Sequence, residues 1–267
     1  MPPTKTNIFI NSRLIAMLAL GFSSGLPFAL TSSTLQTWFT DANVSLIIIG
    51  SLSLLGIPYT LKFLWAPLMD YYGFNRLGKR QGWILLTQLG LAITLFSLAR
   101  MDPVSQTTSM CIIALLVAFF SASQDVAVDA YRTDILAPEE RGLGSAYFVF
   151  AYRVAALLSG GFALVCADYF GWQVTYNLMA VLLLLCMIPA YKAPHAVEYA
   201  PAASSLFRSI LAGILDLMQR DRILLLVLFV IFYKFGTALA MSLMSNFLLH
   251  GLGFSKTEIG LAYKVVS

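Results

Sequence analysis

Residues 108–136 read TSMCIIALLVAFFSASQDVAVDAYRTDIL, and the charges in the second half of this stretch are its most informative feature. The stretch is longer than the about 20 apolar residues that cross a bilayer as a helix. Asp125, Asp129 and Arg132 are spaced i, i+4 and i+7, which places them on one helical stripe, with Gln124 on its adjoining edge. A lipid-facing helix does not tolerate such a stripe. We therefore expect it to face a cavity or another helix.

The composition indicates that the whole chain lies largely in a membrane. Of its 267 residues, 59% are hydrophobic and 11% are charged, whereas soluble domains carry about 25% charged residues. Such a chain has too little polar surface to cover itself in water, but helices in a bilayer satisfy their own backbone groups. We predict an all-α, polytopic membrane protein whose partner is the lipid bilayer. No nucleic-acid binding is expected, because the cations lie in short loops between apolar runs.

Apolar runs of spanning length recur along the chain. We predict a six-helix bundle over residues 1–191, a cytoplasmic linker over 192–221 and the start of a second bundle over 222–267. That is the layout of a two-bundle transporter, although the linker also fits a surface loop in another multispan protein. The predicted spans are Arg13–Phe39, Val44–Tyr72, Trp83–Arg100, Thr108–Leu136, Leu143–Ala167, Val174–Tyr191 and Arg222–Leu249, with an eighth beginning near Thr257.

The distribution of cations predicts the orientation of the chain. A cytoplasmic N-terminus places Arg100 and Lys256 outside and the other loop cations inside, which is the bias seen in membrane proteins. We therefore predict that the N-terminus is cytoplasmic. The inside cations are then Lys5, Arg13, Arg76, Lys79, Arg80, Arg141, Lys192, Arg208, Arg220 and Arg222.

Further charges are predicted inside other spans. Asp125 and Arg153 each lie about 11 residues, or ~16 Å, from the cytoplasmic ends of consecutive antiparallel spans. Their equal depth suggests an ion pair, with Asp129 as the alternative partner of Arg153. Lys62 lies ~12 Å from the inner end of its span, and Lys234 lies near the middle of the seventh. Buried charges of both signs suggest a polar pathway for a substrate or a proton; the alternative is a static network that fixes helix packing.

The sequence shows no arrangement typical of an enzyme. It has no phosphate-binding glycine loop, no zinc-ligand spacing and no plausible Ser/His/Asp set. We expect no enzymatic activity, no cofactor and no metal, with a membrane-embedded enzyme acting on a lipid or glycan as the alternative. Several tyrosines are able to stack on a sugar, although core packing explains each of them taken alone. These are Tyr59, Tyr131, Tyr147 and Tyr152.

A set of motifs carries a family resemblance that covers nearly the whole chain from residue 13 onward. The motifs are GFSSGLP at 21–27, YTLKFLWAPLMD at 59–70, SQDVAVDAYRTD at 123–134, PEERG at 138–142, YR at 152–153, SGG at 159–161 and YKFG at 233–236. They resemble those of the AmpG-type muropeptide permeases of the major facilitator superfamily. The stretches 59–70 and 123–134 are the most specific of the set.

The resemblance implies import of N-acetylglucosaminyl-anhydromuropeptides from periplasm to cytoplasm across the bacterial inner membrane, driven by the proton motive force. Such uptake supports peptidoglycan recycling and, in some bacteria, signals β-lactamase induction. Superfamily carriers of acetyl-coenzyme A share parts of the pattern and are the alternative. The residues at motif positions, expected to bind substrate or proton, are Gln124, Asp125, Asp129, Arg153, Lys62 and Lys234.

The loop after the second span resembles a degraded form of the superfamily's loop motif. Asp70, Lys79 and Arg80 are present and predict a conformational latch, whereas Ala66 stands where a glycine is usual. Thr237, after the YKFG motif, stands where the family often has an acid.

The largest departure from the family is length. Members of the family have about twelve or more spans, and this sequence ends at Ser267, inside the predicted eighth span. We expect part of a longer transporter, a fragment of a split or frameshifted gene, or a half that pairs with another chain. A membrane fragment that does not transport is the alternative.

Overall fold

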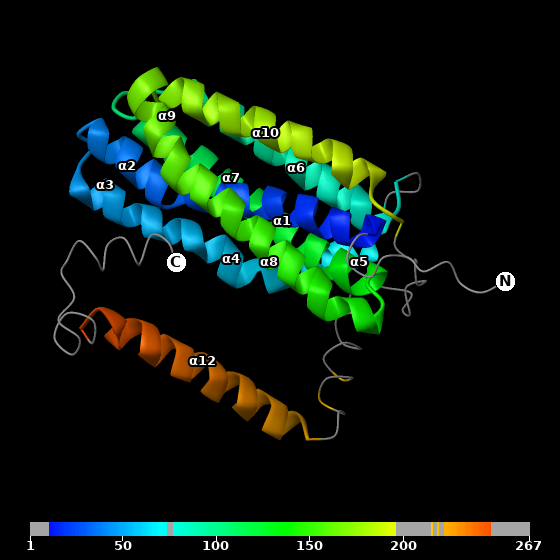
Figure 1. Ribbon diagram of the computed structural model, residues 1–267. Helices are drawn as coiled ribbons and strands as arrows, with labels where there is room; N and C mark the ends of the chain where they lie inside the picture. Colours follow the sequence, from blue (N-terminus) through cyan, green and yellow to red (C-terminus); the bar gives the residue numbers. More distant parts are fainter. Residues whose placement is uncertain (1–10, 74–76, 196–214, 216–217, 219–221, 247–267) are drawn as a thin grey trace. The chain divides into compact units, whose positions relative to one another are not determined.

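The computed structural model describes residues 11–73, 77–195, 215, 218 and 222–246, and these residues are mostly helical, with no strand among them (Figure 1). The prediction of an all-α polytopic membrane protein is confirmed. Within the described residues, six helical segments are long and apolar enough to cross a membrane, and they correspond to the first six predicted spans. They are Ser12–Asp41, Leu46–Leu64, Lys79–Ala99, Thr107–Ile135, Pro138–Phe170 and Trp172–Lys192.

The first span consists of two helices, α1 (Ser12–Thr31) and α2 (Ser33–Asp41). Asn11 caps α1 by accepting the backbone N–H of Leu14 at 2.9 Å. The helix breaks at Ser32, whose backbone ψ of −103° lies outside the helical range. Pro27, inside α1, cannot donate a backbone hydrogen bond to the preceding turn. The predicted first span is therefore interrupted and consists of two helices that meet at Ser32.

The second span is more irregular. It consists of α3 (Leu46–Ser51), the 3₁₀ turn η1 (Leu52–Gly56), α4 (Ile57–Leu61), the 3₁₀ turn η2 (Lys62–Leu64) and α5 (Ala66–Tyr71). Pro58 and Pro67 lack backbone donors, and glycine weakens a helix interior, so regular α-helix cannot persist here. As a result, Lys62 lies at the start of a tight turn inside the span, and Tyr59 lies shortly before that turn.

The remaining helices of the bundle are longer. They are α6 (Lys79–Ala99), α7 (Thr107–Ile135), α8 (Arg141–Leu157), α9 (Ala163–Phe170) and α10 (Trp172–Lys192), with a 3₁₀ turn η3 (Pro138–Glu140) before α8. A π-helical segment, η4 (Leu158–Phe162), joins α8 to α9 within one span. Gly171 has φ of +82°, a conformation that glycine adopts without strain, and this allows the sharp turn between α9 and α10.

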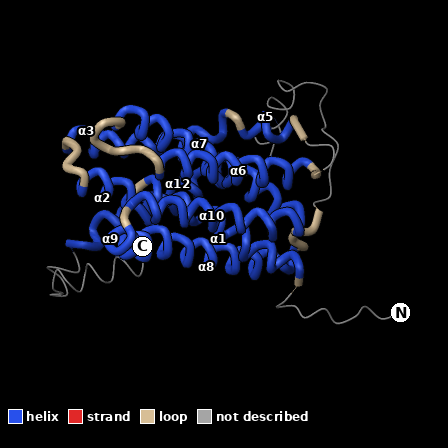
Figure 2. Tube along the Cα trace, turned by 90° about the horizontal axis from the view of Figure 1, so that it is seen from above, coloured by secondary structure: helices blue, strands red, loops and turns tan. Residues whose placement is uncertain are grey.

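Helix α1 is central to the bundle. It packs along α8 and also contacts α7 and α10, both of which pack against α6 (Figure 2). Gly21 and Gly25 allow the closest of these approaches. A Cβ atom on Gly21 would lie 2.3 Å from the backbone oxygen of Phe148, and one on Gly25 would lie 2.4 Å from that of Tyr152. The GxxxG pair thus lets α1 and α8 meet backbone to backbone.

A second compact unit comprises residues 207–267, whereas residues 1–206 form the first. Its described helix, α12 (Ile223–Asn246), corresponds to the predicted seventh span. The predicted domain boundaries at 191 and 221 stay predictions. The predicted eighth span near Thr257 lies outside the described residues, as does Lys256. Most of the predicted linker does too, along with Lys5, Arg76, Arg208 and Arg220.

Candidate substrate and proton site

The buried apolar residues of the bundle form two separate clusters with a polar layer between them. Along α1, the apolar cluster of residues 14–20 is followed by Ser23 and Ser24 and then by residues 26–30 of the other cluster. The same order appears on α6 around Thr87 and Gln88. On α7 the order is reversed: the cluster that contains residues 26–30 precedes the polar residues 121–124, and the cluster that contains residues 14–20 follows them. Three helices therefore carry buried polar side chains at the same level, near the middle of their spans.

Gln124 links α7 to α1 within this polar layer. Its side chain is 1% exposed, and its Nε2 donates to Ser23 Oγ at 2.9 Å and to Ser24 Oγ at 3.5 Å. Its Oε1 is buried and accepts no hydrogen bond from the described residues. Beside it, Trp65 Nε1 donates to Ser123 Oγ at 3.0 Å, which joins the second span to the layer.

Asp125 is half-buried and directly follows Gln124 on α7. The charged groups that act on its carboxylate include Lys62 and Asp129, and the carboxylate in turn acts on Tyr59 and Tyr152. The structure thus brings side chains from the second, fourth and fifth spans together around Asp125. The sequence predicted Arg153 as the partner of Asp125 and did not single out Lys62 as a cationic neighbour of this acid.

Asp129 lies one turn further along α7 and has a different environment. Its carboxylate is 52% exposed and forms an ion pair with Arg132 at 3.0 Å. The guanidinium of Arg132 also lies over the ring of Phe148, 5.0 Å from its centroid. Asp129 is therefore engaged locally on its own helix, so Asp125 is the better candidate for a carboxylate that changes partners.

The structure gives fewer contacts for the two other predicted cations, Arg153 and Lys234. Arg153 lies on the exposed side of α8, and its charge acts on the neighbouring Tyr152. The predicted pairing of Arg153 with Asp125 stays a prediction. Lys234 lies on α12, and its side chain is not among the side chains that the structure describes.

The predicted latch residues Asp70 and Arg80 meet at one end of the bundle. Arg80, near the start of α6, forms an ion pair with Asp70 of α5 and, through Nε at 3.0 Å, with Asp134 of α7. Lys79 lies next to Arg80 and is half-buried. Sequence reasoning missed Asp134, although it closes the 123–134 motif. The arrangement ties three spans together at this end.

Three of the four tyrosines considered for sugar stacking separate into two kinds, and the fourth, Tyr147, is half-buried on α8 and packs against the apolar cluster that contains Leu14 and Tyr131. Tyr131 is fully buried and donates its hydroxyl to the backbone oxygen of Pro194, which is a packing role. Tyr59 and Tyr152, by contrast, flank the ring of Phe28, which sequence reasoning did not consider. The signal that was available for Phe28 is its position directly after the GFSSGLP motif.

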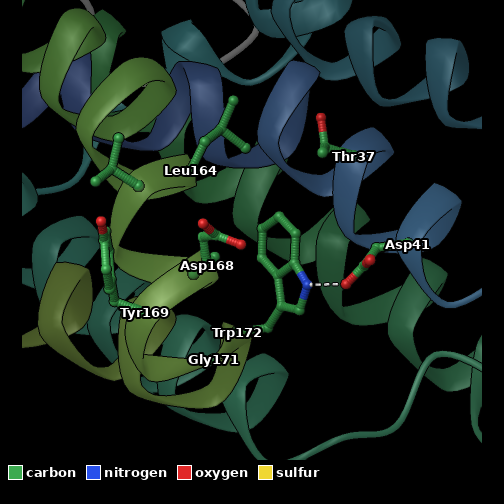
Figure 3. A pocket seen from close by; sticks show the side chains of 9 residues that line it. Thr37, Asp41, Leu164, Asp168, Tyr169, Gly171 and Trp172 are labelled. Atoms are coloured by element: carbon green, nitrogen blue, oxygen red, sulfur yellow. Dashed lines mark hydrogen bonds between the residues drawn. The ribbon is translucent and has the colours of Figure 1, made fainter.

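A cavity of about 770 Å³ lies at the other end of the spans, between the ends of α2 and α9 and the start of α10 (Figure 3). Trp172 Nε1 donates to Asp41 Oδ2 at 2.7 Å, and the indole ring stacks on Trp38 at 5.7 Å. Asp168 also lines this cavity. Tryptophans are enriched at the membrane–water boundary, so we expect the cavity to lie near that boundary and call it the boundary cavity.

The comparisons with known proteins agree with this architecture. The profile described as "Major Facilitator Superfamily" matches residues 14–267. The chain is 44% identical over 260 residues to the "Anhydromuropeptide permease" of Escherichia coli (strain K12), covering 97% of this chain and 53% of that protein. It is 30% identical over 270 residues to "Putative transporter AmpG 4" of Rickettsia conorii, covering 97% and 65%.

A third relative is an "Uncharacterized protein" of Haemophilus influenzae, 36% identical over 269 residues, with 97% of this chain and 62% of that protein covered. The chain thus spans between about half and two thirds of the length of these relatives. The family resemblance inferred from the motifs is confirmed. With its apolar spans and its mid-bundle polar layer, this chain belongs to the Major Facilitator Superfamily, among relatives of the AmpG type.

Proposed function

We propose that this chain is the N-terminal part of a transporter that imports anhydromuropeptides from the periplasm to the cytoplasm in symport with protons. The observation that carries transport is the half-buried Asp125, placed beside a polar layer at mid-span with the Lys62 cation in range. The cargo comes from the 44% identical permease, whose printed name is anhydromuropeptide permease. The chain spans 53% of that permease's length, and the proposed transporter contains a second bundle.

The proposed proton chemistry follows from the position of Asp125. A carboxylate inside an apolar span is costly when it is charged and alone, so its protonation depends on which cation is near. Lys62 stabilises the charged form when it lies close, and moving Lys62 away favours uptake of a proton. Rocking of one bundle against the other supplies such a change of partner. Arg153, on the next helix, is the proposed second cation that Asp125 meets.

Uptake of labelled anhydromuropeptide into inverted and right-side-out membrane vesicles tests the proposal. The full-length gene product is expected to accumulate the label when the outside is acidic. Asp125→Asn is expected to lose about 10²-fold or more of the proton-driven rate, because an amide does not take up the proton that the carboxylate carries. Asp168→Asn, at the boundary cavity, is the matched control and is expected to retain uptake.

Two outcomes contradict the proposal. No uptake by the full-length gene product, including under an imposed proton gradient, rejects the cargo. Uptake that persists in the Asp125→Asn, Asp129→Asn double variant rejects the proton mechanism while leaving the cargo intact. Sequencing the gene downstream of codon 267 separately tests the second bundle: an open frame with further apolar spans supports it, and an immediate stop in the gene argues against it.

A further inference from the structure

The core of the bundle contains a glutamine whose side-chain amide is unpaired at both ends. Gln88, on α6 in the third span, is 0% exposed. Its Nε2 and Oε1 atoms are both buried, and neither forms a hydrogen bond with any described residue. A primary amide carries two donors and an acceptor oxygen with two lone pairs. Because leaving such a group unpaired in an apolar interior is costly, we expect Gln88 to have a partner other than the described residues.

A further unpaired atom lies at the same level of the bundle, on the neighbouring helix. Gln124 Oε1, on α7, is buried without a hydrogen-bond partner among the described residues, whereas its Nε2 donates to Ser23 Oγ at 2.9 Å. Helices α6 and α7 pack against each other. Each glutamine lies where its helix passes from one apolar cluster to the other. The unpaired atoms of the two glutamines therefore lie at one level of the core.

Helical spacing directs both amides into the interior of the bundle. On α6, Ile84, Gln88 and Leu91 are four and three residues apart, so they share one face, and each is at most 1% exposed. On α7, Gln124 and Val128 are four residues apart and are also at most 1% exposed. The two glutamines therefore belong to the faces that α6 and α7 bury, and lipid reaches neither of them.

The chemistry of this level favours a small, neutral molecule that both donates and accepts hydrogen bonds. The two glutamines form no hydrogen bond with each other. Gln88, Gln124 and Ser23 carry no charge, and an uncompensated ion inside a membrane bundle is costly. Ser23 and Ser24 have short side chains, whereas leucines fill the layers on either side of them, so less of the space between the helices is occupied here. Water fits this description, because a buried water typically makes about three hydrogen bonds to polar groups that are otherwise unpaired.

We propose that the bundle binds an ordered water molecule between Gln88 and Gln124. The water donates one hydrogen to each Oε1 and accepts a hydrogen bond from Gln88 Nε2. It thereby joins the third span to the fourth and, through the hydrogen bond between Gln124 and Ser23, to the first. This site goes beyond the proposed function and does not rest on it, since Asp125 interacts instead with side chains of the second and fifth spans.

Solid-state NMR of the whole chain in lipid bilayers, with selectively ¹⁵N-labelled glutamine, tests the water site. Magnetisation from water protons is expected to reach the side-chain nitrogen of Gln88, although this side chain is 0% exposed. The Gln88 signal is identified by its loss in Gln88→Met, or in Gln88→Asn where the methionine variant does not fold.

Two matched variants show whether the water depends on both glutamines. Gln124→Met removes one of the two oxygen atoms to which the water donates, and we expect the transfer to Gln88 to fall by about twofold or more. Gln173→Met is the control, because Gln173 is exposed at the start of α10, and it is expected to leave the transfer to Gln88 unchanged. Thermal unfolding provides a second readout: Gln88→Met and Gln124→Met each leave the other amide unpaired and are expected to lower the unfolding temperature by about 3 °C. The double variant is expected to lose less than the sum of the two.

Three results would overturn the water site. The first is the absence of transfer from water to Gln88 in the wild type, including the case in which the two glutamines are coupled in unfolding and therefore bond to each other directly. The second is transfer to Gln88 that Gln124→Met leaves undiminished or that Gln173→Met reduces equally. The third is a Gln88→Met variant that unfolds at a higher temperature than wild type and is additive with Gln124→Met, since removal of an amide that has no partner stabilises the core.

Discussion

Asp125 and Asp129 lie one helical turn apart, yet their surroundings differ. Sequence spacing placed both on one stripe of α7, and on that basis they were equivalent. The structure pairs Asp129 with Arg132 on its own helix, whereas Asp125 faces side chains from other spans. The difference arises because a helix of regular pitch fixes the direction of a side chain but does not fix which neighbouring helix it meets. At the residue scale, the acids were therefore predictable and their partners were not.

Lys62 and Asp125 are expected to depend on each other for stability. Lys62→Met leaves the Asp125 carboxylate without its cationic neighbour, and we expect a loss of about 1–2 kcal/mol, reduced from the value for fully buried pairs because both side chains are half-buried. The Lys62→Met, Asp125→Asn double variant removes both charges and is expected to recover most of that loss. Thermal unfolding in detergent measures the cycle.

Lys192→Met is the control for this cycle, because Lys192 is exposed at the end of α10. Its effect is expected to be within about 0.5 kcal/mol of zero. Additive effects of the two substitutions, with no coupling between Lys62 and Asp125, would show that the two charges do not interact.

At the scale of elements, the first and fifth spans are interrupted at positions that face each other. The first span breaks at Ser32, between α1 and α2, and the fifth span contains the π-helical segment η4. Thr34 connects the two places, because its hydroxyl donates to the backbone oxygen of Ser159 at 2.8 Å. The π-helical segment lacks the regular hydrogen bonds from each backbone N–H to the carbonyl four residues earlier. A side chain from the first span donates a hydrogen bond to one of its carbonyls instead. The Gly and Ser residues in both places were visible in the sequence, but their pairing was not.

Thr34→Val is expected to destabilise the bundle by about 1–3 kcal/mol. The substitution keeps the shape of the side chain but leaves the buried Ser159 carbonyl without its donor. Thr37→Val is the matched control, since Thr37 is exposed and bonds only within its own helix. Equal unfolding temperatures for the two variants would contradict the role given to Thr34.

The α1–α8 contact gives a second prediction at this scale. Gly25→Ala places a Cβ atom 2.4 Å from the backbone oxygen of Tyr152, so the two helices must separate. We expect a loss of about 1–3 kcal/mol in unfolding free energy. Gly142→Ala, on α8 with no atom within 4 Å of the added Cβ, is the control and is expected to be neutral or stabilising. A Gly25→Ala variant as stable as Gly142→Ala would show that this contact is looser than described.

At the scale of the whole molecule, the orientation in the membrane is predicted from charges that the fold places at one end of the bundle. Arg80 joins Asp70 and Asp134 there, and Arg13 pairs with Glu140 at 3.2 Å. The opposite end carries Asp41 and Asp168 beside the tryptophans of the boundary cavity. The positive-inside rule predicts that the arginine-rich end is cytoplasmic.

Labelling of single cysteines tests this orientation. In a background where Cys111, Cys166 and Cys186 are replaced by alanine, Gln106→Cys is expected to react with a membrane-impermeant maleimide in intact spheroplasts. Glu139→Cys is expected to react only after the membrane is permeabilised. Both positions are exposed turns next to α7, so they form a matched pair. The reverse pattern of labelling would place the N-terminus outside.

The apolar runs, their lengths and the cations between them were sufficient to predict a multi-span helical protein with six spans in its first bundle. This is because a bilayer forces nearly every long apolar run into a helix whatever its neighbours are. The motifs were sufficient for the family. Only the packing of those helices decided three features: the partners of Asp125, the ion pairs by which Arg80 links three spans, and the contacts of Phe28 with Tyr59 and Tyr152. Packing is set by the close approach of Gly21 and Gly25 to α8 and by the interruptions in the first, second and fifth spans. These contacts join residues that are far apart in the chain, and no local sequence pattern predicts which of them meet.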